Sequence, residues 1–482
     1  AAARLAWARS LAARGATDAA ARVLETQLAE SPNMVDVLDA LAEVLAAQGR
    51  WKGVVRTLRR LFALEIDPIR RADRALAIGE VHARKFDDPR GAAGWFKRAV
   101  ELDPGRLRAT WRLLEEARRA PEGEVPVEHV DDAVDRAIAA LRGRVTEQPG
   151  APEPLANLAR LLRQRGLSDA CFLVCATLDY LGAADAPMKA FYEARRERVA
   201  LDFARPLSAE LRDELLVHPH ERGAARALFD AFSLVLTELL ADRVPQGVPR
   251  LSRRSFAPWQ ADFRSLAGGL GLDDVELWNA GRSTEPVRAL YLPQPALAVA
   301  ARLLEGRIDA SQAFALGHRV EGLRAGRLLF ERHGVERVAA CVGRMAEELS
   351  PGIMAGAAVG EALPPDLEGR LLDRARRLPR RLKLQLDTLA ADARLRRGLD
   401  FGRLAQGVAA TRDRAGLLCC GDLRTALDQV IFADEAAAEA ARGTPDGLRA
   451  ALDRSPAAHQ LLAFALGPQL ERLRQVLGLA VS

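Results

Sequence analysis

The chain is poor in cysteine and lacks long apolar runs, and each shortage excludes a class of protein. It has 5 cysteines in 482 residues, which form neither a disulfide framework nor a paired zinc-binding CxxC pattern. No apolar run reaches the roughly 18 residues that a membrane span needs. We therefore expect neither a disulfide-stapled secreted domain nor membrane insertion, and reduced thiols favour a cytoplasmic location for this stretch of chain.

Basic charge is not concentrated anywhere along the chain. The net charge of +5 is the balance of 70 basic and 65 acidic side chains. The densest basic run comprises Arg374, Arg376, Arg377, Arg380 and Arg381. A nucleic-acid interface would need basic residues gathered on one face with aromatic or base-reading side chains beside them. We therefore interpret the run as a solvated helix face and expect no nucleic-acid partner.

The residues that are abundant favour helix. Alanine, leucine and arginine dominate, and all three rank high in helix propensity. Apolar residues make up 49% and charged residues 28% of the chain, whereas aromatic residues make up 5%. These proportions are typical of a folded globular protein, and the length indicates two or three domains.

The first two hundred residues carry a repeat. Pro32, Pro68 and Pro104 recur at a constant spacing, close to the 34 residues of a tetratricopeptide repeat. The clearest unit has Gly79 in its first helix and Phe96 in its second. In such a unit small residues let two antiparallel helices approach, and a proline follows the second helix because it cannot donate the next hydrogen bond.

These matches resemble the tetratricopeptide repeat family over about residues 1–200, in the manner of large repeat proteins of myxobacterial type. The resemblance implies a superhelix whose concave groove binds a peptide or a protein. The repeat register places five acidic side chains in that groove: Asp36, Asp39, Glu43, Asp73 and Glu80. An acidic groove would prefer a basic or neutral partner; the alternative is that these are ordinary solvated charges. Cys171 and Cys175, one turn apart, are interpreted as core packing.

The second half of the chain changes pattern. Residues 201–249 read as a helical connector, in which His218-Pro219-His220-Glu221 is interpreted as a turn between helices because no third metal ligand is suitably spaced. Residues 274–281 and 287–300 read as two strands. A helix capped at Asp309 then runs through residues 311–330, and a further amphipathic helix covers residues 408–430.

This order resembles the HtpX-like zinc metallopeptidases, or minigluzincins, over roughly residues 250–430. In that family one helix carries two zinc-binding histidines and a general-base glutamate, and a later helix carries the third ligand. The corresponding stretch here reads "LGHRVEGLRAGRLLF", in which His318 survives, Arg319 replaces the glutamate and Gly322 replaces the second histidine. In the later stretch Asp413 survives, and Ala409 replaces the ligand glutamate.

The departures predict that the metal site is lost. Catalytic zinc needs three protein ligands and an open position for water, and His318 alone does not supply them. The guanidinium of Arg319 would also repel a cation. We therefore expect no catalytic residue, no bound metal and no cofactor, with the motif positions serving the packing of a pseudo-enzyme domain.

The sequence thus predicts a mainly α protein: a tetratricopeptide-like α-solenoid followed by a helix-rich α+β domain with a small sheet. The expected parts are repeats over 1–200, a connector over 201–249, a degenerate metallopeptidase-like domain over 250–430 and C-terminal helices over 431–482. The function it favours is a non-catalytic protein-interaction scaffold. Two alternatives stay open, namely a structural subunit of a larger assembly and an atypical metallopeptidase.

Overall fold

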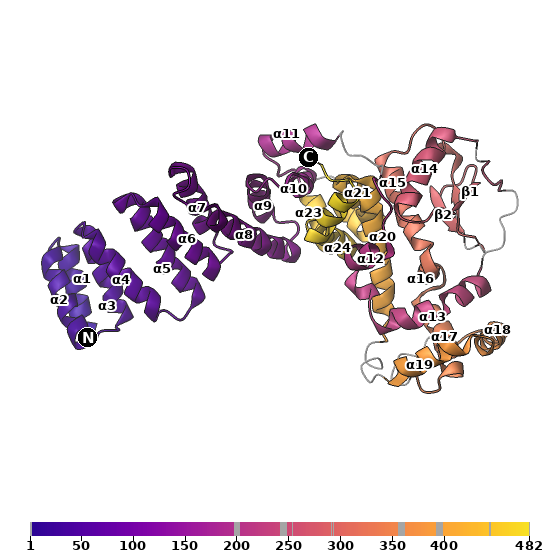
Figure 1. Cartoon of the computed structure of the whole chain (residues 1–482), viewed down its shortest axis with the longest axis horizontal. Helices are drawn as coiled ribbons and strands as arrows, with labels where there is room; N and C mark the ends of the chain where they lie inside the picture. The colour runs from indigo at the N-terminus through magenta and orange to yellow at the C-terminus, as the bar shows by residue number, and fades with distance from the viewer. Residues whose placement is uncertain are drawn as a thin grey trace. The chain divides into compact units, whose positions relative to one another are not determined.

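The protein is mainly α-helical with one small sheet, so the predicted fold class is confirmed (Figure 1). The structure is a computed structural model. It describes residues 2–196, 203–241, 248–252, 254–290, 292, 294–354, 362–391, 399–442 and 445–481. The chain forms two compact units. Unit 1 comprises Ala1–Arg144 and Arg160–Leu167, and unit 2 comprises Val145–Ala159 and Ser168–Ser482.

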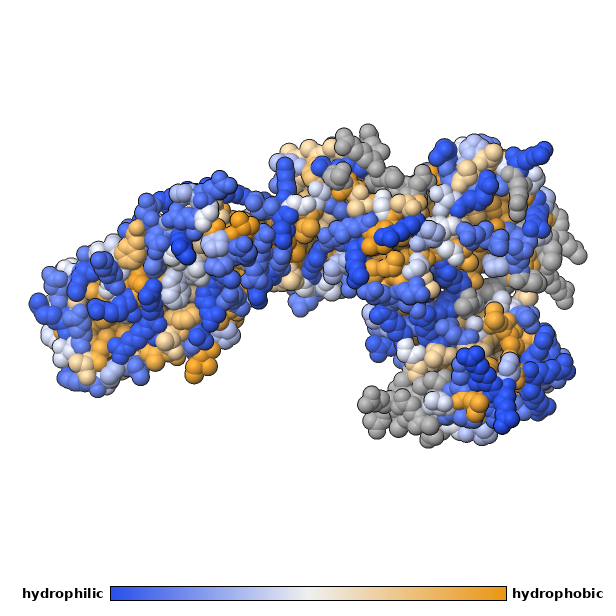
Figure 2. Space-filling model, viewed as in Figure 1, coloured by the Kyte–Doolittle hydropathy of each residue, from blue (hydrophilic) through white to orange (hydrophobic). Residues whose placement is uncertain are grey.

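Unit 1 is a row of helices in which each helix packs on the next and is joined to it by a short connection. The helices are α1 (Ala2–Ala13), α2 (Thr17–Glu30), α3 (Val35–Ala47), α4 (Trp51–Leu64), α5 (Pro68–Val81), the π-turn η1 (His82–Phe86), α6 (Pro89–Leu102), α7 (Leu107–Arg119) and α8 (Val127–Glu147). Leu24, Leu38, Leu61 and Ile78 are almost wholly buried between these helices. Figure 2 shows hydrophilic side chains over much of the visible face of these helices, with apolar side chains between them.

The residues that defined the repeat act as the sequence indicated, with one difference. A Cβ placed on Gly79 would lie 2.5 Å from the ring of Phe96, so only glycine lets α5 and α6 approach this closely. Pro32 and Pro104 follow the ends of α2 and α6, as expected. Pro68 instead is the first residue of α5, where its missing N–H is not needed. Asp67 caps this helix by accepting a hydrogen bond from the Ile69 amide at 3.1 Å.

Unit 2 is a helical assembly that includes a three-stranded sheet. Its helices up to the sheet are α10 (Ser168–Tyr180), α11 (Ala186–Arg196), α12 (Ala209–Leu211), the π-turn η2 (Arg212–Leu216), the 3-10 turn η3 (Pro219–Glu221), α13 (Ala224–Leu239) and α14 (Ala257–Gly269). Those after it are η4 (Ala301–Leu303), α15 (Ala310–Gly322), η5 (Arg324–Gly326), α16 (Leu329–His333), α17 (Val335–Leu349), α18 (Pro365–Arg376), α19 (Arg380–Ala391), α20 (Phe401–Cys420), α21 (Leu423–Ile431), α22 (Glu435–Ala441), α23 (Pro445–Arg454), α24 (Pro456–Ala465) and α25 (Pro468–Val476). Helix α9 (Pro152–Gln164) and the last residues of α8 cross the division between the two units. No helix in the described parts of the chain has the length and apolar character needed to cross a bilayer.

The sheet differs from the expected pair of strands. It consists of β1 (Glu276–Asn279), β2 (Val287–Leu290) and β3 (Ala296–Val299), in the order β1-β3-β2. β3 pairs parallel to β1 and antiparallel to β2, and helix α15 packs on β2. The run 287–300, expected as one strand, is thus two strands of a hairpin, and within it Tyr291 and Pro293 lie outside the described residues. Pro295 precedes β3, where a residue without an N–H is tolerated.

Three further expectations about local conformation can be compared with the structure. Asp309 caps α15 by accepting a hydrogen bond from the Gln312 amide at 2.8 Å, which confirms the predicted start. The helix does not continue to residue 330 as expected. It ends at Gly322, and the chain turns through η5, where Gly326 has a φ of 74° that favours glycine. The segment Pro219–Glu221 is a 3-10 turn, as predicted for a turn between helices.

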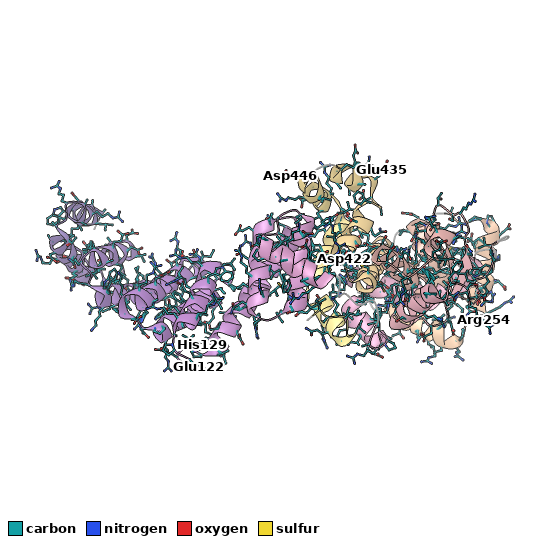
Figure 3. All side chains as sticks on the ribbon, turned by 90° about the horizontal axis from the view of Figure 1, so that it is seen from above. Glu122, His129, Arg254, Asp422, Glu435 and Asp446 are labelled. Carbon is teal, nitrogen blue, oxygen red and sulfur yellow. The ribbon has the colours of Figure 1, made fainter. Side chains whose placement is uncertain are left out.

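Helices α10 and α11, which the sequence analysis assigned to the repeats, pack in unit 2. The Tyr192 hydroxyl donates to Asp422 at 3.0 Å, and the Tyr180 hydroxyl donates to Asp428 at 2.8 Å. Asp422 caps α21 and is labelled in Figure 3. These bonds join residues more than two hundred positions apart, so the packing of α10 and α11 is decided by C-terminal helices.

A buried ion pair also joins α10 to the C-terminal helices. Arg474 donates from Nε and Nη2 to the two carboxylate oxygens of Asp169, each at 2.9 Å, and both side chains are almost wholly buried. The Val481 amide donates to the same carboxylate at 2.8 Å. Asp169 therefore holds both α25 and the C-terminal segment against α10.

We expect Arg474→Met to destabilise the protein by about 3–5 kcal/mol, because it leaves the Asp169 carboxylate buried without its counter-ion. Urea denaturation of the purified protein measures this loss. The matched control is Arg472→Met, whose pair with Glu214 is more than half exposed on both sides, and which should cost less than about 1 kcal/mol. Equal losses in the two variants would contradict a special role for the buried pair.

Candidate functional site

The first candidate site is the face formed by α3 and α5, which carries the five acidic residues expected in the groove. Asp36 and Glu43 are exposed, and no hydrogen bond or ion pair joins them to other described residues. The other three acids each lie beside an arginine: Asp39, Asp73 and Glu80. The two groups of acids therefore differ in what they offer a partner.

The paired acids bind arginines that follow them in the chain. Arg74 contacts Asp39 at 2.7 Å, and Arg106 pairs with Asp73. Glu80 lies 3.1 Å from Arg112 Nε and 3.0 Å from Arg84 Nε. The expected acidic groove is thus neutralised at three of its five positions. The interhelical partners lie about one repeat length further along the chain, a spacing that the sequence contained and that could have revealed the pairing.

The second candidate site lies where α15 and α20 pack together, which brings the two stretches of the metallopeptidase resemblance side by side (Figure 1). A Cβ on Gly317 would lie 2.7 Å from Cys419 Sγ and 2.9 Å from the Ala415 carbonyl oxygen. A Cβ on Gly416 would lie 2.8 Å from the ring of Phe314. Glycine at both positions lets the two helices approach as closely as they do.

Two surviving motif residues face each other across this contact. His318 Nε2 lies 3.6 Å from Asp413 Oδ1, and both side chains are mostly buried. Burial raises the pKa of Asp413 to about 7, although Arg412 acts to lower it. Burial, together with Arg412 and Arg319, holds the pKa of His318 well below its usual value. A histidine with this low pKa is neutral near neutral pH.

Arginines occupy the space around this pair. Arg319 Nη1 donates to Glu331 at 2.6 Å, and another of its nitrogens lies 3.5 Å from Glu285 Oε1. Arg412 also pairs with Glu331, so one carboxylate serves two guanidinium groups. Burial would raise the pKa of Glu331, but Arg412 and Arg319 outweigh it and lower that pKa. Arg412, Glu331 and Glu285 were not among the predicted site residues.

The position that the second histidine would occupy is filled. A Cβ on Gly322 would lie 2.8 Å from Leu328 Cγ and 3.1 Å from Arg412 Nε. Ala409 offers no ligand atom in its side chain. In the described ranges no three histidine, cysteine or carboxylate side chains gather as a metal site would require. The residues present therefore do not fit a zinc ion, whose charge would also meet two guanidinium groups.

Two cavities flank Arg319. One of about 190 Å³ is lined by Glu331 and Arg332, and one of about 390 Å³ is lined by His318 and Asp413. Glu285 and Arg319 line both of them. The ion pair between these two residues thus lies at the boundary of the two cavities.

The comparisons with known proteins give no assignment by sequence. No protein-family model matches the chain, and no curated protein matches it. Solved structures similar to it include MamA, with 17% identity and a TM-score of 0.24 over 40% of this chain and 93% of MamA. YrrB, described as a TPR protein with an unusual peptide-binding site, has 14% identity and a TM-score of 0.25 over 40% of this chain and 90% of its own.

PilF of Pseudomonas aeruginosa is a further similar structure, with 16% identity and a TM-score of 0.23 over 41% of this chain and 90% of PilF. At these identities and TM-scores the likeness assigns no function to the chain. The repeat architecture of unit 1 rests on its own helices and their packing.

The environment of Asp413 predicts a pH dependence. Its pKa is about 7 in the folded chain and near 4 in an unfolded one, so its ionisation costs stability as pH rises from about 4 to about 7. Asp413→Asn removes this cost. The free energy of unfolding of the variant minus that of wild type should therefore rise by about 2–4 kcal/mol between pH 4 and pH 8.

Denaturant titrations of both proteins across this pH range measure the difference. Asp387→Asn, at an exposed position of α19, is the control and should follow the wild-type curve. A difference between Asp413→Asn and wild type that does not change with pH would show that Asp413 ionises as in an unfolded chain.

Proposed function

We propose that this chain is a non-catalytic interaction scaffold, in which the repeats bind a peptide or protein partner and the C-terminal unit is a degenerate metallopeptidase-like domain. The observation that carries the proposal is the position of Arg319. At the motif position of the general base, its guanidinium pairs with Glu331 at 2.6 Å and lies 3.5 Å from Glu285. A permanent cation replaces the carboxylate that would activate a water molecule.

The surroundings of Arg319 support loss of catalysis rather than a rearranged site. Arg412 lies against Gly322, and Glu331, the nearby carboxylate that could act as a base, is held between two arginines. A general base must be within reach of the proton that it removes and must have a matched pKa. Arg412 and Arg319 lower the pKa of Glu331, which makes it a poor base near neutral pH.

Unit 1 supports the binding role through its surface charge. Asp36 and Glu43 lie on α3 as exposed acids, whereas Asp39, Asp73 and Glu80 are compensated. A basic segment of a partner would pair with Asp36 and Glu43. A partner that carries both charges could also replace the arginines that pair with the other three acids. Charges of this kind contribute more to partner choice and association rate than to affinity.

The metal content of the purified protein tests the loss of the metal site. We expect less than about 0.1 zinc per chain after gel filtration, because three protein ligands are needed and His318 is the single motif ligand left. Elemental analysis measures it. One zinc per chain that is lost in His318→Ala but kept in His129→Ala, a control in unit 1, would revive the alternative of an atypical metallopeptidase.

Affinity capture from a native lysate, followed by mass spectrometry, tests the repeat face. We expect a stoichiometric partner that is lost when Asp36 and Glu43 are both changed to lysine, because the charge of the exposed part of the face is reversed. Glu25→Lys on α2 is the control, since Glu25 is also exposed. Retention of the partner by the double variant would exclude this face. Large self-assemblies in light scattering, without a captured partner, would favour the structural-subunit alternative.

A further inference from the structure

A cavity of about 690 Å³ lies in unit 2, distinct from the two cavities beside Arg319. Its walls are formed by parts of the connector, α13, the chain after α14, the β2–β3 hairpin and the turn η5 that follows α15. The volume falls within the roughly 300–1,000 Å³ of small-molecule binding sites. Neither the repeat resemblance nor the metallopeptidase resemblance accounts for it.

Part of the cavity wall is apolar. It consists of leucines contributed by separate elements: Leu207, Leu234, Leu272, Leu290, Leu292 and Leu323. Leu234 is 77% exposed, whereas Leu290 is almost wholly buried. Such a wall, running from solvent inward, suits a chain of methylene groups, since each CH₂ removed from water contributes about 0.8 kcal/mol.

The remaining wall is rich in arginine. Arg212, Arg226, Arg324 and Arg327 line the cavity, together with Asp213 and Asp230. Arg212 and Arg327 are more than nine-tenths buried. Their main partners, Glu321 and Glu221, do not line the cavity. On the wall itself four guanidinium groups accompany two carboxylates, and Glu321 and Glu221, outside the lining, balance the remaining charge.

Two of these arginines keep a nitrogen for a ligand. Arg226 donates from Nε to Asp230 and from Nη2 to Asp213. Arg324 donates from Nε to Glu321 and from Nη2 to the Leu270 carbonyl oxygen. In both side chains Nη1 has no hydrogen-bond partner among the described residues, and neither atom is fully buried. A carboxylate is the group that guanidinium N–H donors match best in geometry.

We propose that this cavity binds a monocarboxylate with an apolar tail, of the fatty-acid class. The leucines contact the tail, and the free N–H groups of Arg226 and Arg324 are available to the carboxylate. A single negative charge fits better than a dianion, because Asp213 and Asp230 also line the wall. The proposal is independent of whether the repeats bind a partner.

Isothermal titration of the full chain with decanoate, below its micellar concentration, tests the site. We expect saturable binding of one decanoate per chain, about tenfold or more weaker binding of decanol, which lacks the charge, and no binding of decylammonium. Absence of saturable decanoate binding, or equal binding of decanoate and decylammonium, would overturn the proposal.

Two variants locate the site. Leu234→Glu should weaken decanoate binding about tenfold or more, because it adds a like charge to the cavity wall. The control Leu384→Glu, at an exposed leucine that does not line the cavity, should leave binding unchanged. Arg226→Met should weaken the binding of decanoate but not that of decanol. In this variant Asp213 still pairs with Arg212, and Asp230 still pairs with Arg327. If both leucine variants behave alike, or if Arg226→Met binds decanoate as wild type does, the site does not lie here.

Discussion

The close packing of α15 on α20 is the contact on which the centre of unit 2 depends. Gly317 and Gly416 have neighbours within 3 Å of where a Cβ would be, so any larger residue would push the helices apart. This contact places His318 beside Asp413 and brings Arg412 against Gly322. The chemistry at the contact between α15 and α20 therefore follows from a packing constraint, and the two glycines are needed whether or not the domain has ever bound a metal.

Arginine supplies most of the positive charge inside the folded chain. Arg474, Arg212 and Arg327 are each more than nine-tenths buried and are each paired with a carboxylate. A planar guanidinium with five donors can satisfy two carboxylates at once, which an ammonium group does less well. Between α15 and α20 the arrangement is reversed, because Arg319 and Arg412 share the Glu331 carboxylate. Such pairs are costly to disturb on one side only, because the partner is left charged in a poorly solvated place.

The repeat face of unit 1 shows the same pairing at the surface, with a different consequence. The pairs Asp39–Arg74, Asp73–Arg106 and Glu80–Arg112 each join one first helix of the repeat to the next or to the residues before it. These pairs are partly buried, with Glu80–Arg112 the most enclosed of the three. They set the charge that a partner meets, and they leave Asp36 and Glu43 as the acids whose charge is not compensated by described residues.

The sequence by itself determined the features that arise within one helix or one repeat unit. The helix-rich composition, the repeat spacing, the Asp309 cap and the approach of Phe96 to Gly79 all follow from local propensity or from one repeat unit. In unit 2, only the tertiary structure decided which charges meet. Arg474 lies about three hundred residues from Asp169, and Arg412 lies far along the chain from Glu331. The end of α15 at Gly322 and the division of residues 287–300 into two strands were likewise decided by the packing around them. Local propensity acts over one or two turns, whereas the partner of a buried charge is the group that the whole fold brings within hydrogen-bond distance.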